Sequence, residues 1–532
     1  MINPIIGSPA DSSGDGVSRR HFLQGAVAGL TAVGAAPLLA ACSSSSSSTA
    51  ASAQQPKRGG RLVAGFTGGS SSDSLNAEAN VSALDNARNT QLYEPLARYD
   101  RNGRVELMLA QELEPNADAT VWTLRLRPGV TFHNGKNLTA ADVLFSLKYI
   151  TNPKKPYQGA SMLAALDLPN AKKLDQHTLQ LTCHKPFSIL PDVFADSITS
   201  IVPENYNPAK PVGTGPFKYE SFTPGQTSTF VRHADYWQSP LPYVDEVVIN
   251  DFSDETSQVN ALSAGNVDLI NNLSAASISA VQSAGNNVLI SKGGGWTPFT
   301  MRVDVAPFND VRVRQAFRHM IDRQQMNELV FKGHGTLGND LFAIWDPAYH
   351  HSLPQREQDS GLAKHLLKQA GREGLTVELV TAPIAQGTTS VAQVLAQQAK
   401  AAGVTVNLRQ VTPTEFYGPN YLKWTFAQDY WYYFGYLSQV TQATLPNAYY
   451  NECHFADPRY TSLYNDCCAI PDPAKRVERE YEMQMIDWNT NGYIIPYFPP
   501  VIDGYAKRVH GVIAAKNGAS FNYNDFKHMW LD

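Results

Sequence analysis

Apolar and polar residues alternate along several short stretches of the chain, the pattern of strands with one buried face. Trp122, Leu124 and Leu126 alternate with polar neighbours over residues 121–127. A Pro-Gly turn signal and a short apolar stretch at 130–132 follow, so the pattern predicts a hairpin there. Further predicted strands lie at 59–66, 217–222, 246–250 and 267–270, with a helix near 254–264 between the last two.

A longer stretch over residues 309–331 has the helical period. Its apolar side chains share one face of the predicted helix: Val313, Phe317, Met320 and Ile321. Its arginines lie outside that face: Arg312, Arg314, Arg318 and Arg323. We interpret this basic stripe as a solvated helix face, and a partner surface is the alternative.

The clearest unit of the chain is a strand, a helix and a second strand within residues 376–408. Its parts are a strand at 376–380, a loop at 381–388, a helix at 390–402 and a strand at 404–408. Such units pair their strands in parallel through right-handed crossovers, so the body is predicted to be α/β. The 381–388 loop lies where open α/β sheets bind ligands, although Thr388 to Ser390 fit plain helix caps equally well.

The N-terminal stretch from Ser18 to Cys42 has the layout of an export signal. It contains the pair Arg19-Arg20 and then an uncharged run from Gly25 to Ala41. That run is too short and too rich in glycine for a permanent span, which needs about 20 apolar residues. The serines and other polar residues from 43 to 55 predict a flexible tether. An apolar N-terminal helix with a buried cysteine is the alternative.

Size and charge exclude some classes of protein. The chain has 532 residues, so the part after the tether is too long for one core and should form two or three lobes. Its 43 basic and 48 acidic residues give a net charge of −5, and no basic run follows Lys57-Arg58. Nucleic acid is therefore not an expected partner.

The cysteines allow a disulfide outside the cytoplasm. If Cys42 is modified, the remaining cysteines are Cys183, Cys453, Cys467 and Cys468. A bond from Cys453 to Cys467 or Cys468 would contribute roughly 3 kcal/mol in the chain-entropy model. A metal or redox site at Cys467-Cys468 has no CxxC spacing or histidine cluster to support it, so a structural role is favoured.

No catalytic motif is present in the chain. The GxSxG, HExxH and GxxxxGK[ST] patterns are absent. Residues 333–338 match GxGxxG but follow a predicted helix instead of a strand, so no dinucleotide site is expected. His350-His351 lacks a nearby third ligand and is interpreted as surface histidine. We expect no enzyme activity, no cofactor and no metal site.

An unusual aromatic run occupies residues 430–436. As a strand it would place Trp431 and Tyr433 on one face and Tyr430, Tyr432, Phe434 and Tyr436 on the other. One interpretation is core packing. The other is a ligand cleft lined by one face, where stacking contributes roughly 0.5–1.5 kcal/mol per pair.

Several motifs together resemble the family 5 extracellular solute-binding proteins of bacterial ABC importers, which bind oligopeptides, dipeptides, nickel complexes and related solutes. The motifs lie in order along the chain at 124–135 with 138–143, 212–217, 234–237, 242–245 and 307–317. Residues 18–23 resemble a twin-arginine (Tat) export signal. Residues 39–42 resemble a lipobox, in which Cys42 becomes diacylated and leads the mature protein.

The resemblance implies a periplasmic-binding-protein-like type II fold (cluster C), with two lobes, a hinge and an extra inserted domain. The implied division is a signal at 1–42, a tether at 43–57, a base lobe from 58–85, 197–295 and 497–532, an inserted domain at 86–196 and a second α/β lobe at 296–496. The solute would lie between the lobes, and closure would follow from tighter binding to the closed form.

The resemblance also bears on the solute. Peptide-binding members use an Asp shortly after the aromatic strand for the α-amino group, and residues 436–439 hold no acid. Dipeptide binders use an Arg near 381–390, which is also missing. An unpaired buried ammonium costs several kcal/mol. A zwitterionic dipeptide is therefore disfavoured against a capped or long peptide, an oligosaccharide or an opine-like solute.

We therefore expect a monomeric, extracytoplasmic lipoprotein that delivers a solute to an ABC permease. Cys42 would hold it at the cell membrane, in the periplasm or on the outer face of the cytoplasmic membrane. The expected cleft residues are Thr67, Gly68, Trp296, Gln386, Trp431, Tyr433, Tyr436 and Ser438. A ligand sensor shares all of these features, and a secreted hydrolase is the rival from another class.

Overall fold

The computed structural model describes residues 55–79 and 82–532 of the chain. The predicted export signal, Cys42 and most of the predicted tether lie outside the described residues. Within the described part, none of the helices combines the length and the apolar character that a membrane crossing requires.

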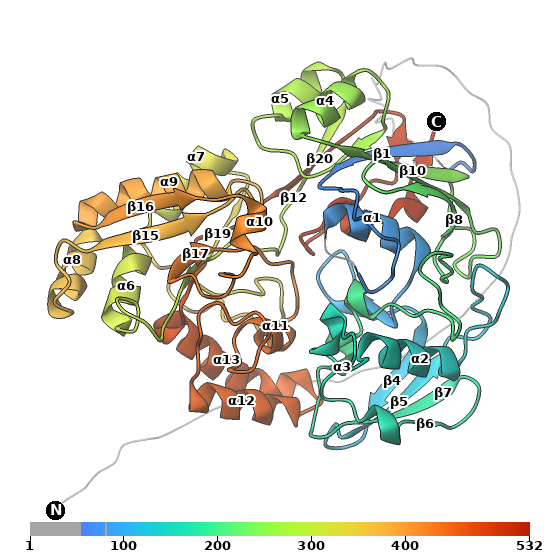
Figure 1. Cartoon of the computed structure of the whole chain (residues 1–532), viewed down its shortest axis with the longest axis horizontal. Coiled ribbons are helices and arrows are strands. Elements are labelled where there is room, and N and C mark those ends of the chain that lie inside the picture. Colours follow the sequence, from blue (N-terminus) through green and yellow to red (C-terminus); the bar gives the residue numbers. More distant parts are fainter. Residues whose placement is uncertain (1–54, 80–81) are drawn as a thin grey trace, which may run out of the picture. The chain divides into compact units, whose positions relative to one another are not determined.

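A seven-stranded sheet has the spatial order β12-β20-β11-β1-β10-β9-β8. Its strands are β1 (Arg61–Thr67), β8 (Phe217–Thr223), β9 (Thr227–Arg232), β10 (Glu246–Phe252), β11 (Leu269–Ile270), β12 (Asn287–Ser291) and β20 (Val501–Tyr505). β1 lies between β10 and β11 and runs parallel to both. α4 (Glu255–Ser263) joins those two strands, as predicted. α4 and α5 (Ile278–Ser283) lie on one side of β1, and α1 (Ala83–Leu92) lies on the other (Figure 1).

A five-stranded sheet has the order β16-β15-β17-β13-β18. Its strands are β13 (Phe299–Met301), β15 (Thr376–Thr381), β16 (Thr405–Gln410), β17 (Phe426–Gln428) and β18 (Tyr493–Ile494). β15 and β16 are parallel and are joined through α9 (Thr388–Ala399) and η4 (Lys400–Ala402), which confirms the predicted unit. Val391 and Leu395 of α9 belong to the same core as Leu379 and Phe426.

The predicted long helix at 309–331 is two helices, α6 (Val311–His319) and α7 (Arg323–Phe331). Asp322 separates them because its side chain caps α7 by accepting from the Gln325 amide. The interpretation of the arginines as a solvated face is wrong for all but Arg312, because the other three are buried.

Arg314, Arg318 and Arg323 are 6%, 0% and 4% exposed. Arg314 donates to the Thr490 carbonyl and Arg318 donates to the Asn491 carbonyl. Arg323 donates to both carboxylate oxygens of Asp340, at 2.9 and 2.8 Å. These buried arginines therefore tie α6 and α7 to neighbouring backbone and to a buried acid.

A four-stranded antiparallel sheet has the order β4-β5-β7-β6. Its strands are β4 (Ala110–Pro115), β5 (Val121–Leu126), β6 (Lys172–Lys173) and β7 (Thr178–Thr182). β5 is the predicted alternating strand, but it pairs with β4 and β7, so the predicted hairpin with 130–132 is wrong. α2 (Ala140–Ile150) follows a capping box of Thr139 and Asp142.

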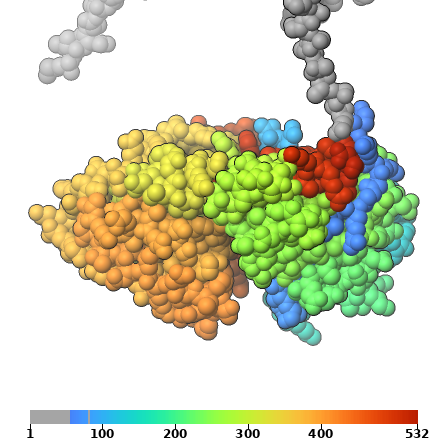
Figure 2. All heavy atoms as spheres, turned by 90° about the horizontal axis from the view of Figure 1, so that it is seen from above, coloured from blue at the N-terminus to red at the C-terminus, as the bar shows by residue number. Residues whose placement is uncertain are grey.

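Shorter elements complete the described chain. They are β2 (Ala97–Tyr99), β3 (Val105–Leu107), β14 (Thr336–Leu337), β19 (Tyr497–Phe498), β21 (Val509–His510), β22 (Trp530–Leu531), α3 (Leu190–Val193), α8 (Ser360–Gln369), α10 (Pro413–Phe416), α11 (Tyr436–Ala443), α12 (Pro458–Cys468), α13 (Pro473–Thr490), α14 (Phe521–Asn524), η1 (Gln158–Ala160), η2 (Leu168–Asn170), η3 (Ser197–Thr199) and η5 (Phe526–His528). The C-terminal residues lie beside the first described strand, red beside blue in Figure 2.

Two connections join the seven-stranded and five-stranded sheets. Residues 292–298 lead from β12 to β13, and residues 495–500 lead from β18 to β20. β12 and β20 are antiparallel neighbours, so the two connections start side by side. Paired crossings of this kind form a hinge between two lobes.

The predicted disulfide is absent from the described part of the chain. Cys183, Cys453, Cys467 and Cys468 are buried free thiols. Cys453 packs against Gly492, whereas Cys467 and Cys468 end α12. The Ser188 amide and hydroxyl donate to the carbonyls of Cys468 and Cys467, at 2.9 and 3.1 Å. These positions give the thiols packing roles.

Candidate functional site

A cavity of about 690 Å³ lies where loops from the seven-stranded and five-stranded sheets meet. Its lining includes Thr67 at the end of β1, Asn271 after β11, Ile384 after β15 and Asp429 after β17. These are the carboxyl ends of strands in parallel pairs. Open α/β sheets bind ligands at that edge. The cavity therefore has the position expected of a solute site.

Most of the predicted cleft residues line this cavity. They are Thr67, Gly68, Trp296, Gln386 and Trp431. Tyr433, Tyr436 and Ser438 do not line it and are each 1% exposed in the core. Tyr433 donates to the Gly103 carbonyl at 3.1 Å, and Tyr436 donates to Asp487 Oδ2 at 2.7 Å.

The aromatic run takes a different form from the predicted strand. The run pairs with another segment only through an isolated antiparallel bridge between Trp431 and Trp296. α11 begins at its last residue, Tyr436. The alternation of faces therefore fails, and Tyr430, Trp431, Tyr432 and Phe434 all line the cavity. The turn into α11 directs Tyr436 and Ser438 into the core instead.

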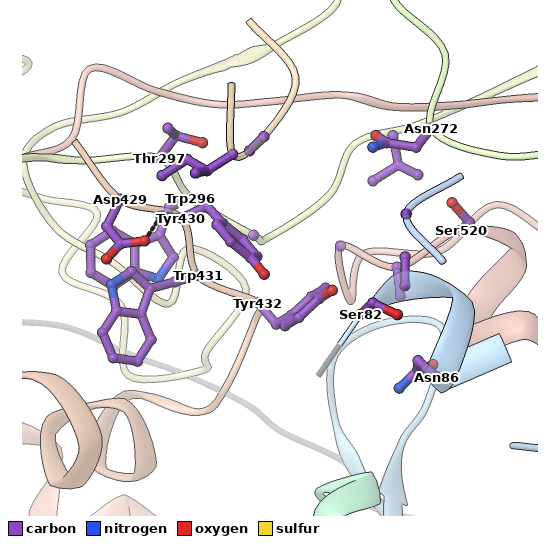
Figure 3. Close-up of a pocket in the computed structure, with 18 of the residues that line it drawn as sticks. Ser82, Asn86, Asn272, Trp296, Thr297, Asp429, Tyr430, Trp431, Tyr432 and Ser520 are labelled. Atoms are coloured by element: carbon purple, nitrogen blue, oxygen red, sulfur yellow. Dashed lines mark hydrogen bonds between the residues drawn. The ribbon is translucent and has the colours of Figure 1, made fainter. Parts of the chain in front are cut away.

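Stacked and edge-on rings form one wall of the cavity. The Trp296 and Trp431 rings are stacked with centroids 5.6 Å apart and 7° between their planes. Tyr430 and Tyr432 meet edge to face, with centroids 5.9 Å apart. Figure 3 shows these two tyrosines extending from the Trp431 side toward Ser82. The wall offers apolar area with phenol groups at its edge.

The cavity is not neutral, which corrects the expectation from residues 436–439. Asp429 precedes the aromatic run and lines the cavity together with Glu452. Asp429 accepts hydrogen bonds from the Tyr417 and Tyr421 hydroxyls, at 2.9 and 3.0 Å. Glu452 is 6% exposed, and its carboxyl group lies within hydrogen-bonding reach of Asp429, Tyr493 and Trp431.

Burial dominates the electrostatics of this acid pair, and the hydrogen bond with Glu452 partly offsets the effect of burial on the pKa of Asp429. Burial raises the pKa of Asp429. Burial, and then the charge of Asp429, raises the pKa of Glu452 well above 4.5. The described residues that line the cavity include no Lys, Arg or His. No basic side chain of the described lining therefore pairs with Asp429 and Glu452. A cationic ligand group placed there would supply the missing positive charge.

The loop between β15 and α9 also lines the cavity, through Ile384, Ala385 and Gln386. Gly387, with φ 79°, precedes α9 and supplies no side-chain cap, so the predicted capping role of Thr388 to Ser390 is wrong. The Thr388 hydroxyl donates to the Ala382 carbonyl at 2.7 Å. Gln386 Nε2 donates to the Asn272 carbonyl at 2.7 Å, which joins the two sides of the cavity rim.

Asp429 and Glu452 were not predicted as cavity residues, and the sequence patterns that could indicate them differ in strength. Asp429 directly follows a buried strand, β17, and a polar residue at the carboxyl end of a parallel strand is a usable signal. Glu452 comes from an irregular segment after α11, and no local pattern marks it. Among residues 55–79 and 82–532, no group of His, Cys, Asp and Glu is placed to hold a metal ion.

The fold and cavity are those of a two-lobe, type II solute-binding protein. The sequence model of the bacterial extracellular solute-binding proteins, family 5 Middle, matches residues 104–451. The chain belongs to this family, whose members are extracytoplasmic substrate-binding proteins of transporters and not enzymes.

Proteins whose names or titles give different solutes are similar to this chain in sequence or in fold. Heme-binding protein A of Haemophilus influenzae is 29% identical over 317 residues, which cover 54% of this chain and 57% of that protein. Glutathione-binding protein GsiB of Salmonella typhimurium is 22% identical over 469 residues, 84% of this chain and 90% of that protein. The structure of AgaA from A. tumefaciens R10 with agropinic acid matches this fold with a TM-score of 0.76 at 23% identity. The match covers 89% of this chain and 99% of that chain.

Proposed function

We propose that this protein captures a solute with a cationic amine, chiefly a peptide with a free amino terminus, and delivers it to an ABC permease. The observation that carries this proposal is the Asp429–Glu452 pair, buried in a cavity whose described lining has no cation. An ammonium group at this pair would restore the charge balance that burial disturbs. The name of GsiB, which refers to the peptide glutathione, is consistent with this class.

We propose that the solute contacts Thr67, Gly68, Trp296, Gln386 and Trp431, in addition to the acid pair. The stacked Trp296 and Trp431 rings support apolar contact with the solute body. The Gln386–Asn272 hydrogen bond supports closure of the two lobes over the cavity. It links the loop between β15 and α9 to the segment that follows β11 of the seven-stranded sheet. Tyr433, Tyr436 and Ser438 are left out of the proposed site because they face the core.

The proposed lobe division follows the sheets. Every strand of the seven-stranded sheet falls within 58–85, 197–295 or 497–532. The four-stranded sheet falls within 86–196 and the five-stranded sheet within 296–496. α1 crosses the proposed boundary at 85/86, since Leu84 and Leu92 both pack in the core of the seven-stranded sheet. The base lobe therefore extends through α1 in our proposal.

Export and anchoring remain proposals from the N-terminal sequence. The twin arginine supports Tat export of a folded body, and diacylated Cys42 with the serine tether would hold a monomer near its permease. Cys42→Ser is expected to move the protein from the membrane fraction to the soluble fraction. Membrane retention of that variant would contradict the anchor.

Titration calorimetry with phenylalanyl-alanyl-alanine and its N-acetylated form tests the amine site. We expect the free peptide to bind at least about tenfold more tightly, since leaving a buried charge unpaired costs several kcal/mol. Asp429→Asn and Glu452→Gln should reduce this preference. Asp235→Asn and Glu220→Gln, at exposed positions, are matched controls. Equal binding of both peptides by the parent would refute the proposed amine site.

A further inference from the structure

A further carboxylate, Asp196, lines a different part of the cavity wall from the Asp429–Glu452 pair. Asp196 caps η3, and its Oδ1 accepts from the Ile198 amide at 3.1 Å. Its neighbour Ser197 accepts a hydrogen bond from Asn86 Nδ2 at 3.2 Å. Figure 3 shows Asn86 on the opposite side of the view from Asp429, with Tyr432 between them. Asp196 therefore belongs to the Asn86 wall.

The second oxygen of Asp196 is held without a partner. Asp196 is 9% exposed, and its Oδ2 is buried with no hydrogen bond among the described residues. Because Oδ1 alone satisfies the helix cap, Oδ2 is left without a partner in a residue that lines the cavity. Burial raises the pKa of Asp196 to about 6, so the carboxylate is charged at neutral pH.

A second buried acid, Glu78, lies near Asp196. It is 2% exposed, and both of its carboxylate oxygens lack hydrogen-bond partners within the described chain. Burial first, and then the charge of Asp196, raises the pKa of Glu78 well above 4.5. The two acids thus lie close enough to interact, yet neither forms an ion pair with any described Lys, Arg or His.

The cavity therefore has two separate acidic regions and no basic side chain among its described lining residues. A solute with one amine would compensate the charge at Asp429 and Glu452 and would leave Asp196 buried and unpaired. A solute with a second cationic group would compensate both regions. Tyr430 and Tyr432 extend into the space between Asp429 and Asn86 (Figure 3), where their rings can contact an alkyl linker or a cation.

We propose that the solute is dicationic, with one cationic group at the Asp429–Glu452 pair and a second at Asp196, backed by Glu78. This inference rests on the proposed function, because it takes the Asp429–Glu452 pair as the first amine site. The shared chemistry of the ligand is two cations joined by a mainly apolar linker. A linear diamine and a peptide with a basic side chain both have this chemistry.

Titration calorimetry on the purified full chain separates these sources with matched probes. Cadaverine is compared with pentylamine, which lacks the second amine. Phenylalanyl-lysine is compared with phenylalanyl-norleucine, which has an uncharged side chain of similar length. We expect the dicationic member of at least one pair to bind about tenfold or more tightly than its partner. The pair that shows this preference identifies the source as diamine or peptide.

The variants assign the preference to Asp196. Asp196→Asn retains the Oδ1 acceptor for the Ile198 amide and removes the charge, so η3 should keep its cap. In this variant, the dicationic probe of the preferred pair should bind about as tightly as its monocationic partner. The affinity for the monocationic probe should stay within about twofold of the parent's affinity. Glu78→Gln, which has no side-chain hydrogen bond to lose in the described structure, should lower the ratio partially. Asp235→Asn, at an exposed site, should leave the ratio unchanged.

The failure of this inference is distinguishable from failure of the proposed function. If monocations bind through Asp429 and the second cation adds less than twofold, the dication inference is overturned and the proposed function stands. A preference that survives Asp196→Asn also overturns the inference. If none of the probes binds, or if Asp429→Asn changes no affinity, the amine site itself is refuted and the inference falls with it.

Discussion

The substitution Glu480→Gln tests quantitatively how the burial of one acid affects the stability of the fold. Glu480 lies on α13 with 3% exposure, and Arg476 Nε donates to it at 2.7 Å. Burial is the main reason that the pKa of Glu480 rises from 4.5 to about 7, and Arg476 opposes the rise. Asp346 and Asp192 are the other charged groups that raise it. Three acids therefore surround one arginine.

The sign of the pH effect follows from the raised pKa. The folded state holds the Glu480 proton more tightly than the unfolded state, so this group's stabilising contribution is full below about pH 4.5 and is lost as the pH rises through about 7. At about 1.4 kcal/mol per pH unit, the rise corresponds to about 3 kcal/mol. Glutamine does not titrate. The stability of the parent relative to Glu480→Gln should therefore fall by up to about 3 kcal/mol between pH 4.5 and 8.

Urea unfolding, followed by tryptophan fluorescence on parent and variant at each pH, measures this difference. The exposed control Glu220→Gln should show a stability difference from the parent that is independent of pH over the same range. A parent-minus-variant difference that stays flat or grows with pH would refute the reasoning. Such a result would mean that the ion pair with Arg476 outweighs the burial of Glu480.

Three further outcomes follow from single contacts. Gln386→Ala removes the hydrogen bond to Asn272 and should raise the solute off-rate about fivefold in stopped-flow measurements, whereas Gln393→Ala, at an exposed position, should not. Trp431→Ala removes the ring stacked on Trp296 and should destabilise the fold by about 3–5 kcal/mol in urea unfolding; a loss below about 1 kcal/mol would contradict that packing. Because the cysteines at 183, 453, 467 and 468 are free thiols, dithiothreitol should leave the melting temperature unchanged, and a drop would reveal a disulfide.

Local patterns predicted the parts of the fold that local interactions determine. The unit of β15, α9 and β16 was predictable because its apolar period, its glycine stop and its strand lengths all agree. The Thr139–Asp142 capping box was predictable for the same reason, since both partners lie within one helical turn. The hairpin at 121–132 failed because β5 takes its partners from β4 and β7, which no turn signal specifies.

The arginines of α6 and α7 show where the amphipathic rule fails. The rule assigns Arg318 to solvent because it treats charge as a surface property. In the structure, Arg318 is fully buried and donates to the Asn491 and Tyr493 carbonyls, at 2.6 and 3.1 Å. Those acceptors lie far along the sequence. A helical period cannot indicate that a distant segment offers unpaired carbonyls.

The candidate site was predictable at its edges and not at its acidic regions. Thr67 ends β1 and Gln386 follows β15, two strands of parallel pairs, so the general rule for α/β sheets places both residues at the cavity. Asp429 obeys the same rule, but the family resemblance places the expected acid after the aromatic run, and Asp429 precedes that run. Glu452 and Asp196 reach the cavity only through tertiary packing of irregular segments, and their chemistry is visible only when the lining is assembled.

In the proposed site, the placement of the acids would make lobe closure the step that selects the solute. In an open form, water solvates Asp429, Glu452 and Asp196, and solutes of any charge can contact the aromatic wall at little electrostatic cost. Closure removes that water, so a neutral or anionic solute leaves the carboxylates uncompensated and gains little from the closed form. A cationic solute compensates them and favours closure. A permease that accepts only the closed form would then transport cations selectively, although the open cleft admits a wider range of solutes.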